Sequence, residues 1–152
     1  MIARFVHSIW LGSGVFLILA AQAAFRAAPN STVAADLVGA MLGRWHYIAL
    51  AAPIALLALE WRRARSAVLI VIFAGVVLAA AQAMVDLRIR SIRASSAIPM
   101  SDLSRQDPLR RQFGRLHGFS MLLLLMQVIA AGVALGIDSV PVRPPSPAPP
   151  AP

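Results

Sequence analysis

The feature that most constrains this chain is its set of long uncharged apolar runs. The three longest have 21, 20 and 22 residues and cover residues 5–25, 66–85 and 116–137. A helix rises about 1.5 Å per residue, so each run can cross a hydrocarbon core of about 30 Å. A fourth run, residues 45–59, is shorter, but it extends toward residue 33 if the long side chain of Arg44 reaches the interface. We therefore predict four membrane-spanning helices.

These runs predict an all-α fold, an antiparallel bundle of four transmembrane helices in a domain over residues 5–137. The expected spans are approximately residues 5–25, 40–61, 66–88 and 112–137. In the alternative interpretation, Arg4 and the apolar run that follows form a signal peptide with a cleavage site at Ala21-Gln22-Ala23, and its removal would leave three spans.

Turn signals separate the expected spans. Pro29 and Asn30 break the chain after the first span, and Ser31 or Thr32 can cap the next helix. Residues 86–111 are expected to form a polar loop.

Prolines mark three further features of the chain. Asp107 followed by Pro108 is typical of a helix start. Pro53 predicts a kink in the second span. The Pro-rich segment 138–152 is predicted to be a disordered tail.

The composition agrees with a membrane protein. Hydrophobic residues make up 59% of the chain and charged residues 13%, against about 25% charged residues in soluble domains. These values, with a mean hydropathy of +0.76, exclude a soluble enzyme domain and a disordered protein. The chain has no cysteine, which excludes disulfides, thiolate metal sites, iron–sulfur clusters and thiol catalysis.

The positive charge of the side chains is carried by arginine, and the chain has no lysine. All 14 basic residues are arginines, the net charge is +8 and the pI is about 11.9. Such a pI raises nucleic acid as a partner, but the arginines flank apolar runs, so we expect the lipid bilayer as partner and no nucleic acid. With four spans, five arginines lie on the side of the termini and nine on the side of residues 86–115. The positive-inside rule then places that loop in the cytoplasm and both termini in the periplasm of a bacterial inner membrane.

Polar residues within or beside the spans are the candidate site, because such residues are costly in a membrane. Most of them are predicted at the membrane face that holds the large loop, as a polar cluster: Gln22, Arg26, Arg44, His46, Gln82, Asp86, Arg115, His117 and Ser120. His7 is expected at the opposite face and Gln127 in the middle of the membrane. The cluster is interpreted either as a polar vestibule or as helix ends that reach water and headgroups.

Within this cluster, His46 and His117 are the main candidates for ligands of a metal or haem. Two histidines at one depth can ligate haem or share a metal, and a set completed by Met84 and Met121 would suit Cu(I). Packing is the alternative role of the methionines. No other cofactor is predicted.

The sequence shows no catalytic arrangement. Ser120 and His117 are close in the fourth span, but no carboxylate is placed to orient the histidine. The carboxylates near the spans, Glu60 and Asp86, are expected at opposite faces, so they form no acid–base pair. We therefore expect a protein without enzymatic activity.

Small residues within the spans predict close helix packing. They occur as Gly12 and Gly14 in the first span, Gly75, Ala79 and Ala83 in the third, and Gly132 and Gly136 in the fourth. Such faces allow close approach within the bundle or in a homo-oligomer.

Two groups of residues carry a family resemblance. The first comprises His7, Trp10, Gly12, Phe25, Arg26 and Pro29. The second comprises Asp107, Pro108, Arg111, Phe113, Arg115, His117, Gly118 and Ser120. With these signatures the chain resembles, over residues 5–137, the family of the eukaryotic transmembrane protein 205, whose bacterial members are mostly of unknown function.

The resemblance implies a four-helix membrane protein and no defined reaction. The link of the eukaryotic member with platinum-drug resistance suggests export or trafficking of soft metals. A more remote likeness to the membrane domain of copper-resistance D proteins and to four-helix haem-pathway oxidases points the same way. We expect a non-enzymatic membrane protein that acts in transport or in metal or drug tolerance. The alternatives are a haem- or copper-binding protein that uses His46 and His117, and a small haem-pathway redox enzyme.

Overall fold

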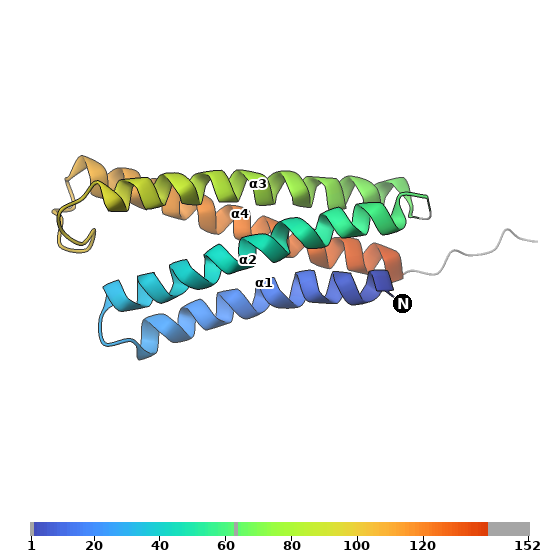
Figure 1. Ribbon diagram of the computed structural model, residues 1–152, viewed down its shortest axis with the longest axis horizontal. Helices are drawn as coiled ribbons and strands as arrows, with labels where there is room; N and C mark the ends of the chain where they lie inside the picture. Colours follow the sequence, from blue (N-terminus) through green and yellow to red (C-terminus); the bar gives the residue numbers. More distant parts are fainter. Residues whose placement is uncertain (1, 63, 140–152) are drawn as a thin grey trace, which may run out of the picture.

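The computed structural model describes residues 2–62 and 64–139, and this part of the chain contains helices and no strands. The helices are α1 (Ile2–Ala27), α2 (Ser31–Glu60), α3 (Ser66–Ala94) and α4 (Pro108–Ser139). All four are long and apolar enough to cross a membrane. The predicted all-α architecture of four apolar helices is thus confirmed (Figure 1). Most of the predicted tail, residues 140–152, lies outside the described residues.

The helices run antiparallel around a common core, with α1 and α3 each packed against both α2 and α4. The start of α1, the α2–α3 connection and the end of α4 lie at one end, which we call the terminal end (Figure 1). The α1–α2 turn and the segment 95–107 lie at the other, which we call the loop end. Toward the loop end the α1–α2 pair diverges from α3 and α4 (Figure 1).

The second helix is longer than the predicted span. It begins at Ser31, well before residue 40, and Asn30 is its N-cap, because the Asn30 side chain accepts a hydrogen bond of 2.9 Å from the backbone N–H of Val33. The cap is therefore neither Ser31 nor Thr32. Pro53 lies buried inside α2, and the helix continues on both sides of it.

The polar loop is shorter than predicted. Helix α3 continues to Ala94 and α4 begins at Pro108, so residues 95–107 connect them instead of 86–111. The helix start at Asp107 and Pro108 is confirmed. Asp107 Oδ1 accepts hydrogen bonds from the backbone N–H groups of Leu109, at 2.7 Å, and Arg110, at 3.4 Å.

The core consists of two apolar clusters stacked along the bundle. The first surrounds Trp10 in the half nearer the terminal end and contains Trp10, Ala52, Leu56, Val68, Ile72, Ala131 and Ala134. The second lies further toward the loop end and contains Leu17, Trp45, Ala49, Ala79 and Leu124. Large apolar residues also cover the outside of the helices, for example Phe16, Ile70 and Leu122. This outer surface suits contact with lipid.

The small residues differ in what they contact. A Cβ on Gly75 would lie 2.4 Å from Cη2 of Trp10, and one on Gly14 would lie 2.7 Å from Cγ2 of Val128. These two glycines allow the close packing expected within the bundle. In contrast, a Cβ on Gly136 would meet no described atom within 4 Å. The predicted homo-oligomer stays a prediction.

Candidate functional site

Five buried or nearly buried polar side chains from three helices form a continuous row, which we call the polar network. Its members are His46 of α2, Gln82 and Asp86 of α3, and Ser120 and Gln127 of α4. Gln82 and Gln127 have no exposed surface, Ser120 is 3% exposed and Asp86 is 5% exposed. The network extends from the middle of the bundle toward the loop end.

Contacts between neighbours join the network. Ser120 Oγ donates to Asp86 Oδ1 at 2.6 Å, and Gln82 Nε2 donates to Ser120 Oγ at 3.5 Å. Gln127 Nε2 donates to Gln82 Oε1 at 2.5 Å. His46 Nε2 lies 3.1 Å from Asp86 Oδ2, which is an ion-pair distance without hydrogen-bond alignment. The network thus links α2, α3 and α4 in a buried region, where a polar group has few other hydrogen-bond partners.

The order of the groups limits their chemistry. In a serine–histidine–aspartate triad the imidazole lies between the hydroxyl and the carboxylate, so that it can take the hydroxyl proton. Here Asp86 lies between Ser120 and His46, and the hydroxyl donates to the carboxylate. This order suits the holding of helices better than the activation of a nucleophile.

The structure divides the predicted polar cluster. It brings together His46, Gln82, Asp86 and Ser120, and it adds Gln127 from the middle of the membrane. The other members are exposed and lie outside the network: Gln22, Arg26, Arg44, Arg115 and His117.

The proposed metal ligands are spread over different surroundings. His46 contacts Asp86, whereas the exposed His117 stacks on Phe113 with ring centroids 5.8 Å apart and an interplanar angle of 3°. Met84 is 71% exposed and Met121 is 44% exposed, so both lie on the outer surface. The described structure therefore gathers no four-ligand set from these residues.

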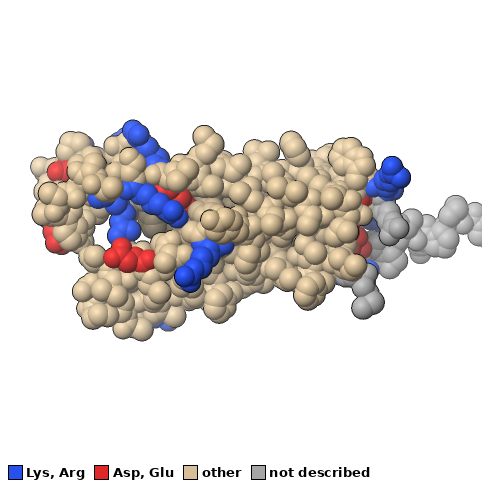
Figure 2. Space-filling model, in the orientation of Figure 1, with Lys and Arg blue, Asp and Glu red and all other residues tan. Residues whose placement is uncertain are grey.

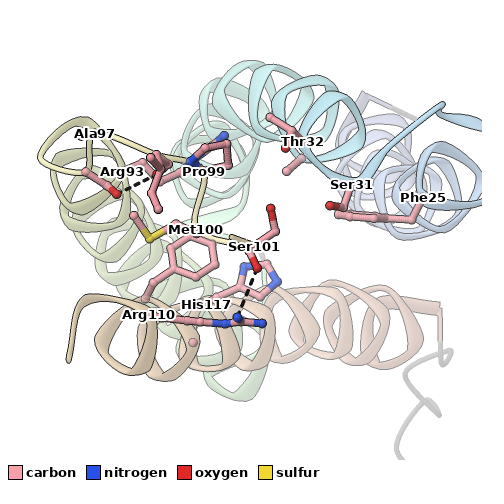
Figure 3. Close-up of a pocket in the computed structure, with 15 residues that line it drawn as sticks. Phe25, Ser31, Thr32, Arg93, Ala97, Pro99, Met100, Ser101, Arg110 and His117 are labelled. Carbon is pink, nitrogen blue, oxygen red and sulfur yellow. Dashed lines mark hydrogen bonds between the residues drawn. The ribbon is translucent and has the colours of Figure 1, made fainter. Parts of the chain in front are cut away.

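A cavity of about 650 Å³ lies at the loop end between the α1–α2 turn and the α3–α4 connection. Phe25, Ser31 and Thr32 lie on one side of it, and Met100, Ser101 and His117 lie on the other (Figure 3). Its lining also includes these residues: Ala35, Arg93, Ser96, Ala97, Ile98, Pro99, Arg110, Phe113 and Gly114. The space-filling view shows this end of the molecule hollowed, with arginines and some acidic side chains around the hollow (Figure 2).

Two arginines of the lining have protein partners. Arg93 Nη2 lies 2.5 Å from Asp36 Oδ1, and this pair joins α2 and α3 beside the cavity. Arg110 Nη1 donates to the backbone oxygens of Ser101, at 3.2 Å, and Leu103. Carbonyl groups do not neutralise a guanidinium, so the Arg110 contacts fix the connecting segment and leave positive charge at the cavity wall.

A second, smaller polar cluster lies at the terminal end. Potential ligand atoms of His7 (α1), Glu60 (end of α2) and Asp138 (end of α4) lie within 4.8 Å of one another. We call it the terminal triad. The sequence interpretation placed Asp138 in the tail and expected Glu60 to have no carboxylate nearby, so this cluster was missed. The sequence signal that could have found it is that Asp138 directly follows the apolar run 116–137, as Glu60 directly follows the run 45–59, so both carboxylates end spans on the same side of the membrane.

The four apolar helices of the chain establish an integral membrane protein, and in Figure 2 the face between the loop-end charges and the terminal end shows no charged side chain. No protein-family model, no curated protein and no solved structure matches this chain.

Proposed function

We propose that this membrane protein is non-enzymatic and binds an anionic amphiphile in the loop-end cavity, in support of transport or tolerance of such compounds. The observation that carries the proposal is the cavity itself. It combines an apolar wall with arginines at the end of the membrane-spanning helices. A cavity of about 650 Å³ falls within the range of about 300–1,000 Å³ that is typical of small-molecule sites.

The lining supports an amphiphile in preference to a polar solute. Phe25, Phe113 and Ile98 offer apolar surface for a chain or ring system. Arg110 supplies positive charge that its carbonyl partners leave uncompensated. The negative end of a ligand would lie beside Arg110 near the interface, and its apolar part would extend along the aromatic wall.

The polar network supports the proposal that the protein is non-enzymatic. The carboxylate of Asp86 separates Ser120 from His46, so the hydroxyl has no imidazole base in this arrangement. The network then acts as a support that holds α2, α3 and α4 beside the cavity.

The family resemblance also supports the part of the proposal that concerns tolerance of such compounds. The chain resembles the family of transmembrane protein 205, whose eukaryotic member is linked with platinum-drug resistance. The excess of arginines at the loop end favours a cytoplasmic position for this end by the positive-inside rule. The cavity would then take its ligand from the cytoplasmic leaflet.

Photolabelling in lipid nanodiscs tests the proposal. The probe is a palmitate with a diazirine in its chain, and the labelled peptides are mapped by mass spectrometry. We expect labelling at the cavity wall, for example at Phe113, and weaker labelling with the matching fatty alcohol, which lacks the negative charge.

Gly114 provides a variant that fills the cavity. It lines the cavity, and a Cβ there would meet no described atom within 4 Å, so Gly114→Trp is expected to fold and to reduce labelling several-fold. Gly118→Trp is the matched control, because Gly118 lies one turn further along α4, has equally open surroundings and does not line the cavity. Equal labelling of wild type and Gly114→Trp, or labelling confined to the outer helix surfaces, would rule out the proposed site.

A further inference from the structure

The terminal triad contains buried polar atoms without a partner. His7 has no exposed surface, and neither its Nδ1 nor its Nε2 has a hydrogen-bond partner among the described residues. Glu60 is 7% exposed, and its Oε2 also has no hydrogen-bond partner in the described part of the chain. Buried polar groups in native structures are nearly always paired, so three such atoms in one place require an explanation.

The two carboxylates in this cluster add a second problem. Glu60 and Asp138 lie within the same 4.8 Å group, and two negative charges at such a distance repel each other. Arg4 Nε lies 3.7 Å from Asp138 Oδ2, but the Arg4 side chain is 68% exposed, so solvent weakens this pair. The buried Glu60 has no cation among the described ion pairs.

A bound cation would resolve both problems at once. It would accept a lone pair from an imidazole nitrogen of His7, and it would offset the charges of Glu60 and Asp138. We propose that His7, Glu60 and Asp138 bind a divalent transition-metal ion of the Zn²⁺ type. Two carboxylates and a neutral imidazole together carry a charge of −2, which balances the ion.

The donor set selects this class of metal. Imidazole nitrogen with carboxylate oxygen suits Zn²⁺ and its neighbours in the first transition row, whereas Cu(I) prefers sulfur ligands. The site differs in this respect from a set built on Met84 and Met121. Three protein ligands leave a fourth tetrahedral position for water.

The position of the triad allows both access and a structural effect. The side chain of Asp138 is 27% exposed, so an ion can enter from the terminal end. The apolar cluster around Trp10 lies inward of His7 and separates the site from the polar network. The ligands come from α1, α2 and α4, so the ion would join three helices where the chain supplies no hydrogen bonds between these side chains.

Zinc binding to the full-length protein tests the proposal. The protein is purified in detergent with a tag that lacks histidine, treated with a chelator and dialysed against Zn²⁺. We expect one Zn²⁺ per chain by elemental analysis and a higher melting temperature after zinc addition, because an ion that binds only the folded state stabilises it.

Near-isosteric variants identify the ligands. Glu60→Gln and Asp138→Asn keep the side-chain shape and are expected to weaken zinc binding more than about tenfold, since even the loss of an outer-shell partner typically costs about 10- to 100-fold. Asp138→Asn is the variant of choice for folding, because Asp138 is partly exposed. His117→Ala removes an exposed histidine at the other end and should leave the affinity unchanged.

Cobalt gives an independent spectroscopic test. Co²⁺ at the site should show visible d–d bands that change in Asp138→Asn and persist in His117→Ala. A wild-type protein that binds no Zn²⁺ after chelator treatment would overturn the proposal. Equal zinc affinity in wild type and Asp138→Asn would do the same, since it would indicate adventitious binding only.

Discussion

The two ends of the bundle place polar groups in different ways. At the loop end, the members of the polar network contact one another, and the arginines lie around an open cavity. At the terminal end, His7 and Glu60 are buried, but three of their polar atoms lack a partner in the described chain. The network also contains three atoms without a hydrogen-bond partner in the described chain, namely His46 Nε2, Asp86 Oδ2 and Gln127 Oε1. The difference is that hydrogen bonds between side chains join most of the network, whereas none joins the members of the terminal triad among the described residues.

The largest expected effect concerns the polar network. We expect Asp86→Ala to lower the free energy of unfolding by about 3 kcal/mol, because Ser120 and His46 lose their common partner in a buried place. Unfolding in mixed micelles, followed by circular dichroism, measures the effect. Asp86→Asn is the control, since its amide oxygen can still accept from Ser120, and it should cost less.

Unfolding in mixed micelles also tests the difference between the loop end and the terminal end. Glu60→Gln in chelator-treated protein removes a buried carboxylate whose Oε2 has no hydrogen-bond partner in the described structure. Its free energy of unfolding should therefore stay near the wild-type value or rise. If Glu60→Gln were as destabilising as Asp86→Ala, the contrast between the two ends would be lost.

An intermediate effect is expected where Trp10 separates the two polar regions. In Gly75→Ala the new Cβ would lie 2.4 Å from Cη2 of Trp10 and 2.5 Å from Cζ2, so the buried indole must shift. We expect a loss of about 2 kcal/mol in the free energy of unfolding, which is typical of overpacking. Gly136→Ala is the control, because its Cβ would meet no described atom within 4 Å, and no loss is expected there. Equal stability of the two variants would mean that the indole of Trp10 can shift without a measurable cost in the free energy of unfolding.

A small effect is expected at the ion pair of Arg93 and Asp36 beside the loop-end cavity. The Arg93 and Asp36 side chains are 35% and 63% exposed, so their ion pair is open to water. A double-mutant cycle with Arg93→Gln and Asp36→Asn should give a coupling energy below about 1 kcal/mol. The coupling should fall further at high salt, because screening acts on exposed charges. A coupling energy that is larger and independent of salt would show that this ion pair is more shielded from water than its exposed fractions indicate.

Much of the fold could be predicted from the sequence because hydrocarbon thickness sets the length of a spanning helix. The four apolar runs predicted four helices, and Asp107 with Pro108 predicted the start of α4. The expected second span began only at residue 40, because Asp36 interrupts an otherwise apolar stretch, although the capping residues Ser31 and Thr32 already indicated a helix start near the observed one. The structure shows that Asp36 pairs with Arg93, which leaves the helix intact around it.

The candidate site was less predictable. Gln82 and Asp86 are four residues apart and share one face of α3, and the structure connects both to Ser120. His46 and His117 were paired by depth alone. His46 points to Asp86, whereas His117 is exposed at the cavity and stacks on Phe113. Depth along a helix and the residues that share one face follow from residue numbers, but which face turns toward a neighbouring helix does not.

The sequence by itself determined the number, approximate length and antiparallel order of the helices, because apolar runs of this length have few stable alternatives in a membrane. Only the tertiary structure decided which face of each helix points inward. The helices are apolar on both the buried and the lipid-facing sides, so hydrophobicity does not distinguish the two. Close contacts such as Trp10 on Gly75 set the rotation of the helices, and that rotation brought Asp138 beside Glu60 and His7.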